Sequence, residues 1–167
     1  MADDFESFMR ERLPALVRYG YVLSGNPHDA ADLAQEALAR LSERWRRVSA
    51  NGDPEGYVRV TMARLHISAW RRLRRELPFG APPERSYVDS GLDRADGDVG
   101  LVDALRALPP TFRVVLVLRY YDDRSDPEIA ELLGISRATV RTRSARALQR
   151  LRRAPGVPQK LTGEVVR

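Results

Sequence analysis

The sequence has 167 residues and no cysteine, which excludes disulfides, thiolate zinc sites and a cysteine nucleophile. Its only imidazoles belong to His28 and His66, so a histidine-rich metal centre is excluded as well. The longest unbroken apolar run covers residues 114–118, too short to cross a bilayer, and the acidic N-terminus does not resemble a secretory signal. We therefore expect a soluble, cytoplasmic protein without a membrane-inserted segment, a metal site or a cofactor.

Lysine is almost absent too: of 28 basic residues only Lys160 is a lysine, and 23 acidic residues leave a net charge of +5. Arginine's planar fork suits phosphates and guanine edges, so this choice favours nucleic acid as a partner, although a codon bias would give the same excess. Residues 1–75 carry 13 basic and 10 acidic residues, residues 76–100 carry 2 and 6, and residues 101–167 carry 13 and 7. The proline- and glycine-rich middle segment lacks apolar periodicity, which is typical of a flexible linker. The pattern indicates two basic modules joined by an acidic linker.

Both modules are predicted to be helical, because sustained period-2 alternation is missing, and the expected fold class is all-α. In the first module we expect a helix over residues 3–23 that Pro14 interrupts, a second helix capped by Asn26, and a third that starts at Asp53 and Pro54. Two apolar stripes should form the core of a small helical bundle. They comprise Leu33, Ala37, Leu41 and Trp45 on the second helix, and Val58, Met62, Leu65, Ala69 and Leu73 on the third.

The second module begins with a short helix that Pro109 and Pro110 end. The apolar residues 112–121 fit a strand or a buried helix, and the flanking elements favour the helix. After them the signals are local and clear: Ser125 and Glu128 form a capping box, Gly134 ends that helix, and Ser136 caps a last helix that runs to about residue 153.

Residues 126–143 have the pattern of a helix-turn-helix. On its second helix one face should be buried, formed by Val140, Ser144, Ala147 and Leu151. The opposite face, near the N-terminus, should point outward with Arg137, Ala138, Arg141 and Thr142. A recognition helix presents base edges from this end. A solvated basic helix would explain the charge but not the order of cap, glycine and cap, so the pattern favours DNA binding.

Two helix faces in the first module also carry charge. A polar and basic stripe on the third helix could follow a nucleic-acid backbone or be an ordinary exposed face. It comprises Tyr57, Thr61, Arg64, Ser68, Arg71 and Arg75. An acidic face on the second helix suits the helix dipole or a basic protein partner. It comprises Asp29, Asp32, Glu36, Arg40, Glu43 and Arg47. Phosphate loops, nucleophile elbows and zinc motifs are missing, so we expect no enzyme.

Three stretches, in this order, resemble an extracytoplasmic-function (ECF) RNA polymerase sigma factor of the SigE-like group. Residues 29–37 are similar to the segment that grips the coiled coil of the polymerase clamp, and residues 57–72 to the helix that meets the minus-ten element. Residues 108–113 and 126–143 resemble the region that reads the minus-thirty-five element. The resemblance implies a transcription initiation factor whose partners are core RNA polymerase and double-stranded and melted promoter DNA. It also allows an anti-sigma factor as a partner.

By position, the resemblance implies sigma region 2 at residues 1–75, a linker at 76–100, a region 4 helix-turn-helix at 101–153 and a tail at 154–167. The residues expected to bind core polymerase are Asp29, Asp32, Gln35 and Glu36. The loop 46–53 would capture an unpaired promoter base, and the expected minus-ten contacts are Arg46, Arg47, Asn51, Tyr57, Thr61, Arg64, Ser68 and Arg71. The expected minus-thirty-five contacts are Ser136, Arg137, Thr139, Arg141, Thr142 and Arg143. The sequence departs from the family at Arg64, where asparagine is usual, and at Ala138, where glycine is common.

The sequence also fits two other functions. A dimeric helix-turn-helix repressor or activator would bind its operator unaided, but it leaves the acidic face and the basic stripe of the first module without a role. A protein-interaction adaptor, in which the arginines only solubilise, would show no salt-dependent DNA binding.

Overall fold

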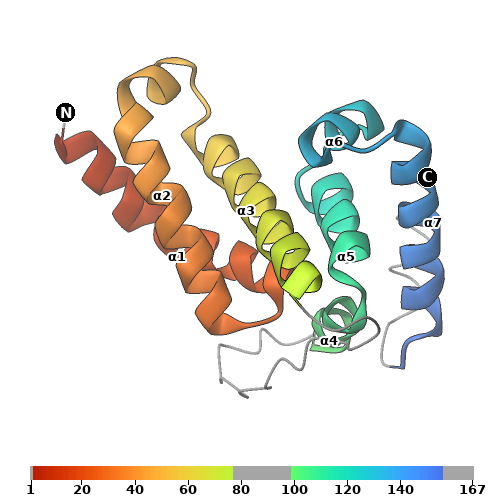
Figure 1. Ribbon diagram of the computed structural model, residues 1–167. Coiled ribbons are helices and arrows are strands. Elements are labelled where there is room, and N and C mark those ends of the chain that lie inside the picture. The colour runs from red at the N-terminus through yellow and green to blue at the C-terminus, as the bar shows by residue number, and fades with distance from the viewer. Residues whose placement is uncertain (1, 77–98, 156–167) are drawn as a thin grey trace. The chain divides into compact units, whose positions relative to one another are not determined.

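The computed structural model describes residues 2–76 and 99–155, which belong to two compact units. Every regular element in these two ranges is a helix (Figure 1), which confirms the all-α class. The predicted linker lies outside the described residues except at its ends, where Glu76 closes one helix and residues 99–100 begin another. The predicted tail lies outside them from residue 156 onward. Among the helices described, none combines the length and apolar character that a bilayer crossing requires.

The first unit is built from α1 (Ala2–Ser24), α2 (Pro27–Ala50) and α3 (Pro54–Glu76), and each of them packs against the other two. The centre of the unit holds fully buried side chains from all three helices, among them Tyr19, Leu41 and Met62. Gly20 permits this close packing, since a Cβ there would lie 2.9 Å from the Ala30 carbonyl oxygen and 3.0 Å from the Met62 methyl.

The expectation that Pro14 interrupts the first helix is wrong, because α1 runs through it without a break. Pro14 removes the donor to the carbonyl of Arg10, four residues earlier. Both residues are exposed, so water can hydrate that carbonyl and the helix tolerates the lost bond.

The predicted helix starts are confirmed. Gly25 adopts φ 68°, and the Oδ1 of Asn26 accepts from the amides of His28 at 2.9 Å and Asp29 at 3.2 Å. At α3, the Oδ1 of Asp53 accepts from the amide of Gly56 at 2.8 Å. These side chains satisfy amides at each helix start that would otherwise lack a partner.

The predicted apolar stripes are buried only in part. On α2, Ala37 and Leu41 are buried, while Leu33 and Trp45 are half-buried. The Trp45 ring lies 5.4 Å from the rings of Phe5 and Phe8 of α1. On α3 the buried face is turned relative to the prediction. It comprises Val58, Thr61, Met62, Ala63, His66 and Ile67, whereas Leu65, Ala69 and Leu73 are half-buried.

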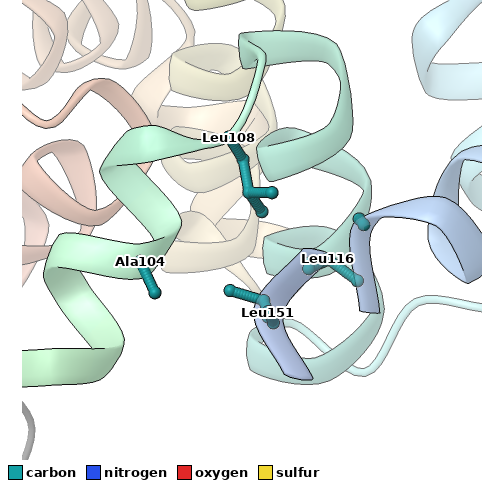
Figure 2. Packing of buried hydrophobic residues seen from close by; sticks show 5 residues of the cluster. Ala104, Leu108, Leu116 and Leu151 are labelled. Atoms are coloured by element: carbon teal, nitrogen blue, oxygen red, sulfur yellow. The ribbon is translucent and has the colours of Figure 1, made fainter. Parts of the chain in front are cut away.

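The second unit contains α4 (Val99–Ala107), α5 (Pro110–Leu116), the π-helical turn η1 (Val117–Tyr121), α6 (Asp126–Leu133) and α7 (Arg137–Arg153). Residues 112–121 are therefore helical, which decides against the strand, but the π-helical turn at their end was not predicted. Buried Ala104, Leu108, Leu116, Ala147 and Leu151 join α4, α5 and α7 in one apolar cluster (Figure 2).

Arg113 of α5 is buried, with 5% of its surface exposed, and ties α4 to α5. Its Nε donates to the carbonyl of Leu105 at 2.9 Å, and its Nη2 donates to those of Arg106 at 3.3 Å and Leu108 at 3.0 Å. These carbonyls lie at or just beyond the C-terminal end of α4, where backbone acceptors lack helical donors and the helix dipole favours a cation.

Candidate nucleic-acid interface

The helix-turn-helix of the second unit is held by hydrogen bonds within its own segment. The Oε2 of Glu128 accepts from the Ser125 amide at 2.7 Å and from the Ser125 hydroxyl at 2.8 Å, and these bonds hold the pKa of the Glu128 carboxyl below its ordinary 4.5. Gly134 ends α6 in the left-handed conformation, with φ 64°. Ser136 begins α7 by accepting from the Thr139 amide at 3.0 Å. The capping box, the glycine and the second cap are confirmed.

The two faces of α7 differ as expected. Its inward face is buried throughout and comprises Val140, Ser144, Ala147 and Leu151. Its outward face near the N-terminus is exposed at Arg137, Ala138, Arg141 and Thr142. Among the other predicted minus-thirty-five residues, Ser136 is exposed, whereas Thr139 and Arg143 are half-buried. The Thr139 hydroxyl lies 2.8 Å from that of Ser136, so it belongs to the helix cap.

Sequence reasoning missed a polar contact behind this face. Arg119 of η1 donates from Nη1 to the Ser144 hydroxyl at 3.0 Å, and the same nitrogen lies 3.3 Å from Oδ1 of Asp126 at the start of α6. One guanidinium therefore contacts side chains of both helices of the helix-turn-helix. The available signal was Ser144 itself, a polar residue in an otherwise apolar inward face.

The basic stripe of α3 is exposed only from its middle onward. Arg64, Ser68 and Arg71 are exposed, and Tyr57 is half-buried. Thr61 was placed on the same outward stripe, and this is wrong: it is buried, and its hydroxyl donates to the Tyr57 carbonyl at 2.7 Å. The residue completes the core face of α3 beside Val58 and Met62, so it cannot present its hydroxyl to DNA.

The loop expected at residues 46–53 is mostly helix, because α2 continues through Arg46 and Arg47 to Ala50. The turn is confined to three residues, with Gly52 at φ 84°. Arg46, Arg47 and Asn51 are all exposed around it. A hollow of about 420 Å³ lies beside this turn. It is lined by Asp4, Ser7, Phe8, Glu11 and Arg12 of α1 and by Gly52, Asp53, Pro54 and Glu55 of the turn and α3.

The acidic face of α2 points away from the core. Asp32, Gln35 and Glu36 are exposed, and Asp29, in the first helical turn, is half-buried. Glu36 pairs with Arg40 at 2.8 Å, but both side chains are more than half exposed, so this ion pair contributes little to stability. These carboxylates remain accessible to a protein partner.

Comparison with known proteins identifies both units. Residues 8–76 match the model of Sigma-70 region 2, and residues 99–151 match that of Sigma-70, region 4. The RNA polymerase sigma-E factors of Streptomyces coelicolor and Streptomyces avermitilis are each 38% identical over 150 residues, which span 89% of this chain and 84% and 83% of those proteins. The ECF RNA polymerase sigma factor SigE of Mycolicibacterium smegmatis is 34% identical over 160 residues, or 89% of this chain and 60% of that protein.

A solved structure supports the fold independently. The sigma factor RpoE of Bartonella quintana, crystallised with the anti-sigma factor NepR, aligns with a TM-score of 0.59 at 21% identity, over 98% of this chain and 99% of that one. The sequence relatives decide against the autonomous repressor and the adaptor, since both units match sigma regions. The chain belongs to the ECF RNA polymerase sigma factors: it is a transcription initiation factor that binds core RNA polymerase and directs it to promoter DNA.

Proposed function

We propose that this sigma factor reads its promoter through two surfaces, one on each unit, and meets core polymerase through the acidic face of α2. We assign region 2 to residues 1–75 and region 4 to residues 101–153, with the linker between them and a tail after residue 153. The observation that carries the proposal is the two-faced α7, whose exposed arginines stand opposite a fully buried face.

The outward face of α7 is proposed to enter the major groove of the minus-thirty-five element. Arg137 and Arg141 are one helical turn apart and exposed, and an arginine can bind guanine O6 and N7 with two hydrogen bonds. Ser136 and Thr142 flank them on the same exposed surface. Thr139 and Arg143 are half-buried, so we expect them to stabilise this face and to contact DNA less than the exposed residues do.

The minus-ten surface is proposed to combine the exposed part of α3 with the neighbouring turn. Arg64, Ser68 and Arg71 would contact the DNA backbone, and Tyr57 would lie at the N-terminal end of this row of side chains on α3. Arg46 and Arg47 are exposed near the end of α2, and Asn51 is exposed in the turn that follows it. An unpaired base from the melted strand would be captured at this turn and outside the neighbouring hollow, whose lining carries the carboxylates of Asp4, Glu11, Asp53 and Glu55.

Core polymerase is proposed to bind Asp32, Gln35 and Glu36, with Asp29 at the edge of the contact. Carboxylates at this face would repel DNA, whereas they would attract a basic protein surface.

We further propose that the protein acts in the cytoplasm, by binding alone, and catalyses no reaction. An anti-sigma factor remains a proposed partner, since the structure of RpoE contains one.

Transcription in a defined system tests this assignment. Core polymerase, the purified chain and a promoter template should yield a transcript that requires both proteins and both promoter elements. Arg141→Ala should reduce it, whereas Arg18→Ala, which removes an exposed arginine of α1 outside the proposed surfaces, should not. Selection of the same DNA sequence by the chain without polymerase, at equal affinity, would contradict the proposal.

A further inference from the structure

Ser144 is an unusual member of the face on which α7 packs. Only 2% of its surface is exposed, and the other buried residues of this face are Val140, Ala147 and Leu151. A buried hydroxyl without a hydrogen-bond partner destabilises a fold, so an apolar residue would be the simpler choice here. Ser144 is compatible with the core because Arg119 donates to its Oγ at 3.0 Å.

Arg119 contacts two helices through one nitrogen. Its Nη1 lies 3.0 Å from Ser144 on α7 and 3.3 Å from Oδ1 of Asp126, the first residue of α6. The guanidinium comes from η1, a π-helical turn in which the Asp122 amide donates to the Val117 carbonyl five residues earlier. Such turns occur often at functional sites. The contact therefore joins η1, α6 and α7 at one point.

The position of this contact along α7 matters for DNA reading. Ser144 follows Arg141 by three residues, so the fixed point lies within one helical turn of the outward arginine. Apolar packing alone is non-directional and tolerates small rotations of a helix about its axis. A hydrogen bond from a charged donor has a preferred direction and a short length. Such a bond would restrict the rotation of α7 and thereby the direction in which Arg141 points.

We propose that Arg119 is a positioning residue: through Ser144 it fixes the rotation of the recognition helix, and so it determines minus-thirty-five specificity without contacting a base. The inference rests on the proposed assignment of α7 as the reading helix. It differs from a phosphate contact in one measurable way. A phosphate contact changes affinity for all sequences alike, whereas a positioning residue changes the ratio between the right and the wrong sequence.

The test uses holoenzyme assembled from core polymerase and the full chain. Binding is measured on a promoter and on the same promoter with its minus-thirty-five element replaced, and the ratio of the two dissociation constants gives the discrimination. Ser144→Ala is the decisive variant, because a buried residue cannot touch DNA and loss of one oxygen leaves the packing intact. We expect discrimination to fall about tenfold, toward the low end of what one mismatched base pair costs. Arg119→Met should give a similar fall, and the double variant no further one.

Two controls separate position from charge and from stability. Arg124→Met removes a cation from the segment between η1 and α6, where Arg124 pairs with Glu128 at 3.6 Å, and it should leave discrimination unchanged. Thermal unfolding of each variant, followed by circular dichroism, should show that the second unit remains folded at the assay temperature.

The outcomes that would overturn the inference are distinct. If Arg119→Met weakens binding equally on both promoters and lowers the salt dependence while Ser144→Ala does nothing, then Arg119 is a phosphate contact. If Arg141→Ala lowers discrimination but neither variant of the pair does, the positioning role alone fails. If none of the three lowers it, the assignment of α7 as the reading helix fails as well.

Discussion

Replacement of the buried Arg113 by methionine should destabilise the second unit specifically. The change removes three donated hydrogen bonds, at 2.9, 3.0 and 3.3 Å. The carbonyls of Arg106 and Leu108 lose this donor, whereas the carbonyl of Leu105 still accepts from the Leu108 amide at 3.1 Å. Each hydrogen bond from a charged group contributes about 1.5–3 kcal/mol, and unpaired buried carbonyls add to the loss. Water can reach the end of a short helix and recover part of this, so we expect a net loss of about 3–5 kcal/mol.

Such a loss is large for a small domain, whose whole stability is about 5–15 kcal/mol. Urea unfolding of the full chain measures it, with circular dichroism following the helices of both units. Both tryptophans, Trp45 and Trp70, belong to the first unit, so tryptophan fluorescence reports on that unit and should not change. Arg146→Met makes the same chemical change at an exposed site and should cost less than about 0.5 kcal/mol. A loss below about 1 kcal/mol for Arg113→Met would refute the reasoning.

Three further predictions concern charged residues. Asp32→Arg or Glu36→Arg should abolish association with core polymerase, measured by co-purification, because each places a like charge against the expected basic partner. Arg141→Ala should cost about 1–3 kcal/mol in holoenzyme binding if it reads a guanine, with discrimination lost at one upstream base pair. The lowered pKa of Glu128 means that its ionised form stabilises the fold at pH values above 4.5 and that this contribution is lost as the pH falls through the lowered value. The difference in unfolding free energy between wild type and Glu128→Gln should therefore shrink below pH 4.5.

Each of these three predictions would be contradicted by a specific result. Unchanged co-purification of both α2 variants would remove that face from the polymerase contact, and circular dichroism checks that both still fold. An equal loss on every promoter variant would mark Arg141 as a phosphate contact. A Glu128→Gln difference that stays constant as the pH falls would mean that charge plays no part in the capping box.

The features that the sequence predicted best are those whose partners are close in the chain. Asn26, Ser125 and Ser136 each accept from an amide two or three residues later, so a short pattern of letters contains the whole interaction. Gly134 is equally local, because its positive φ depends on its own backbone. Contacts between residues far apart in the sequence were missed for the opposite reason. Arg119 and Ser144 are 25 residues apart, and neither residue type indicates the other.

Periodicity also fails where neighbouring helices end. Along α3 the buried residues stop at Ile67, and residues 71–76 are exposed except for half-buried Leu73. Apolar spacing identifies a face of a helix but not the length over which other helices cover it. The burial of Leu73 was therefore overestimated. Thr61 was misplaced by the same limit, since α1 and α2 both pack on α3 and a residue at the edge of the stripe lies in the core. The proposed contacts of Arg64, Ser68 and Arg71 do not share this problem, because all three are exposed.

The closed ends of α6 have a thermodynamic consequence for promoter binding. Its first turn is satisfied by Ser125 and Glu128 and its last by the backbone amide of Gly134, so the shape of the motif does not depend on a ligand. Docking then requires no coupled folding, and its heat-capacity change should reflect only the surface that protein and DNA remove from water. A preorganised domain of this kind loses little conformational entropy on association. Little of the binding free energy of its arginines is then needed to order the domain, so their preference for one base over another is retained in the measured affinity.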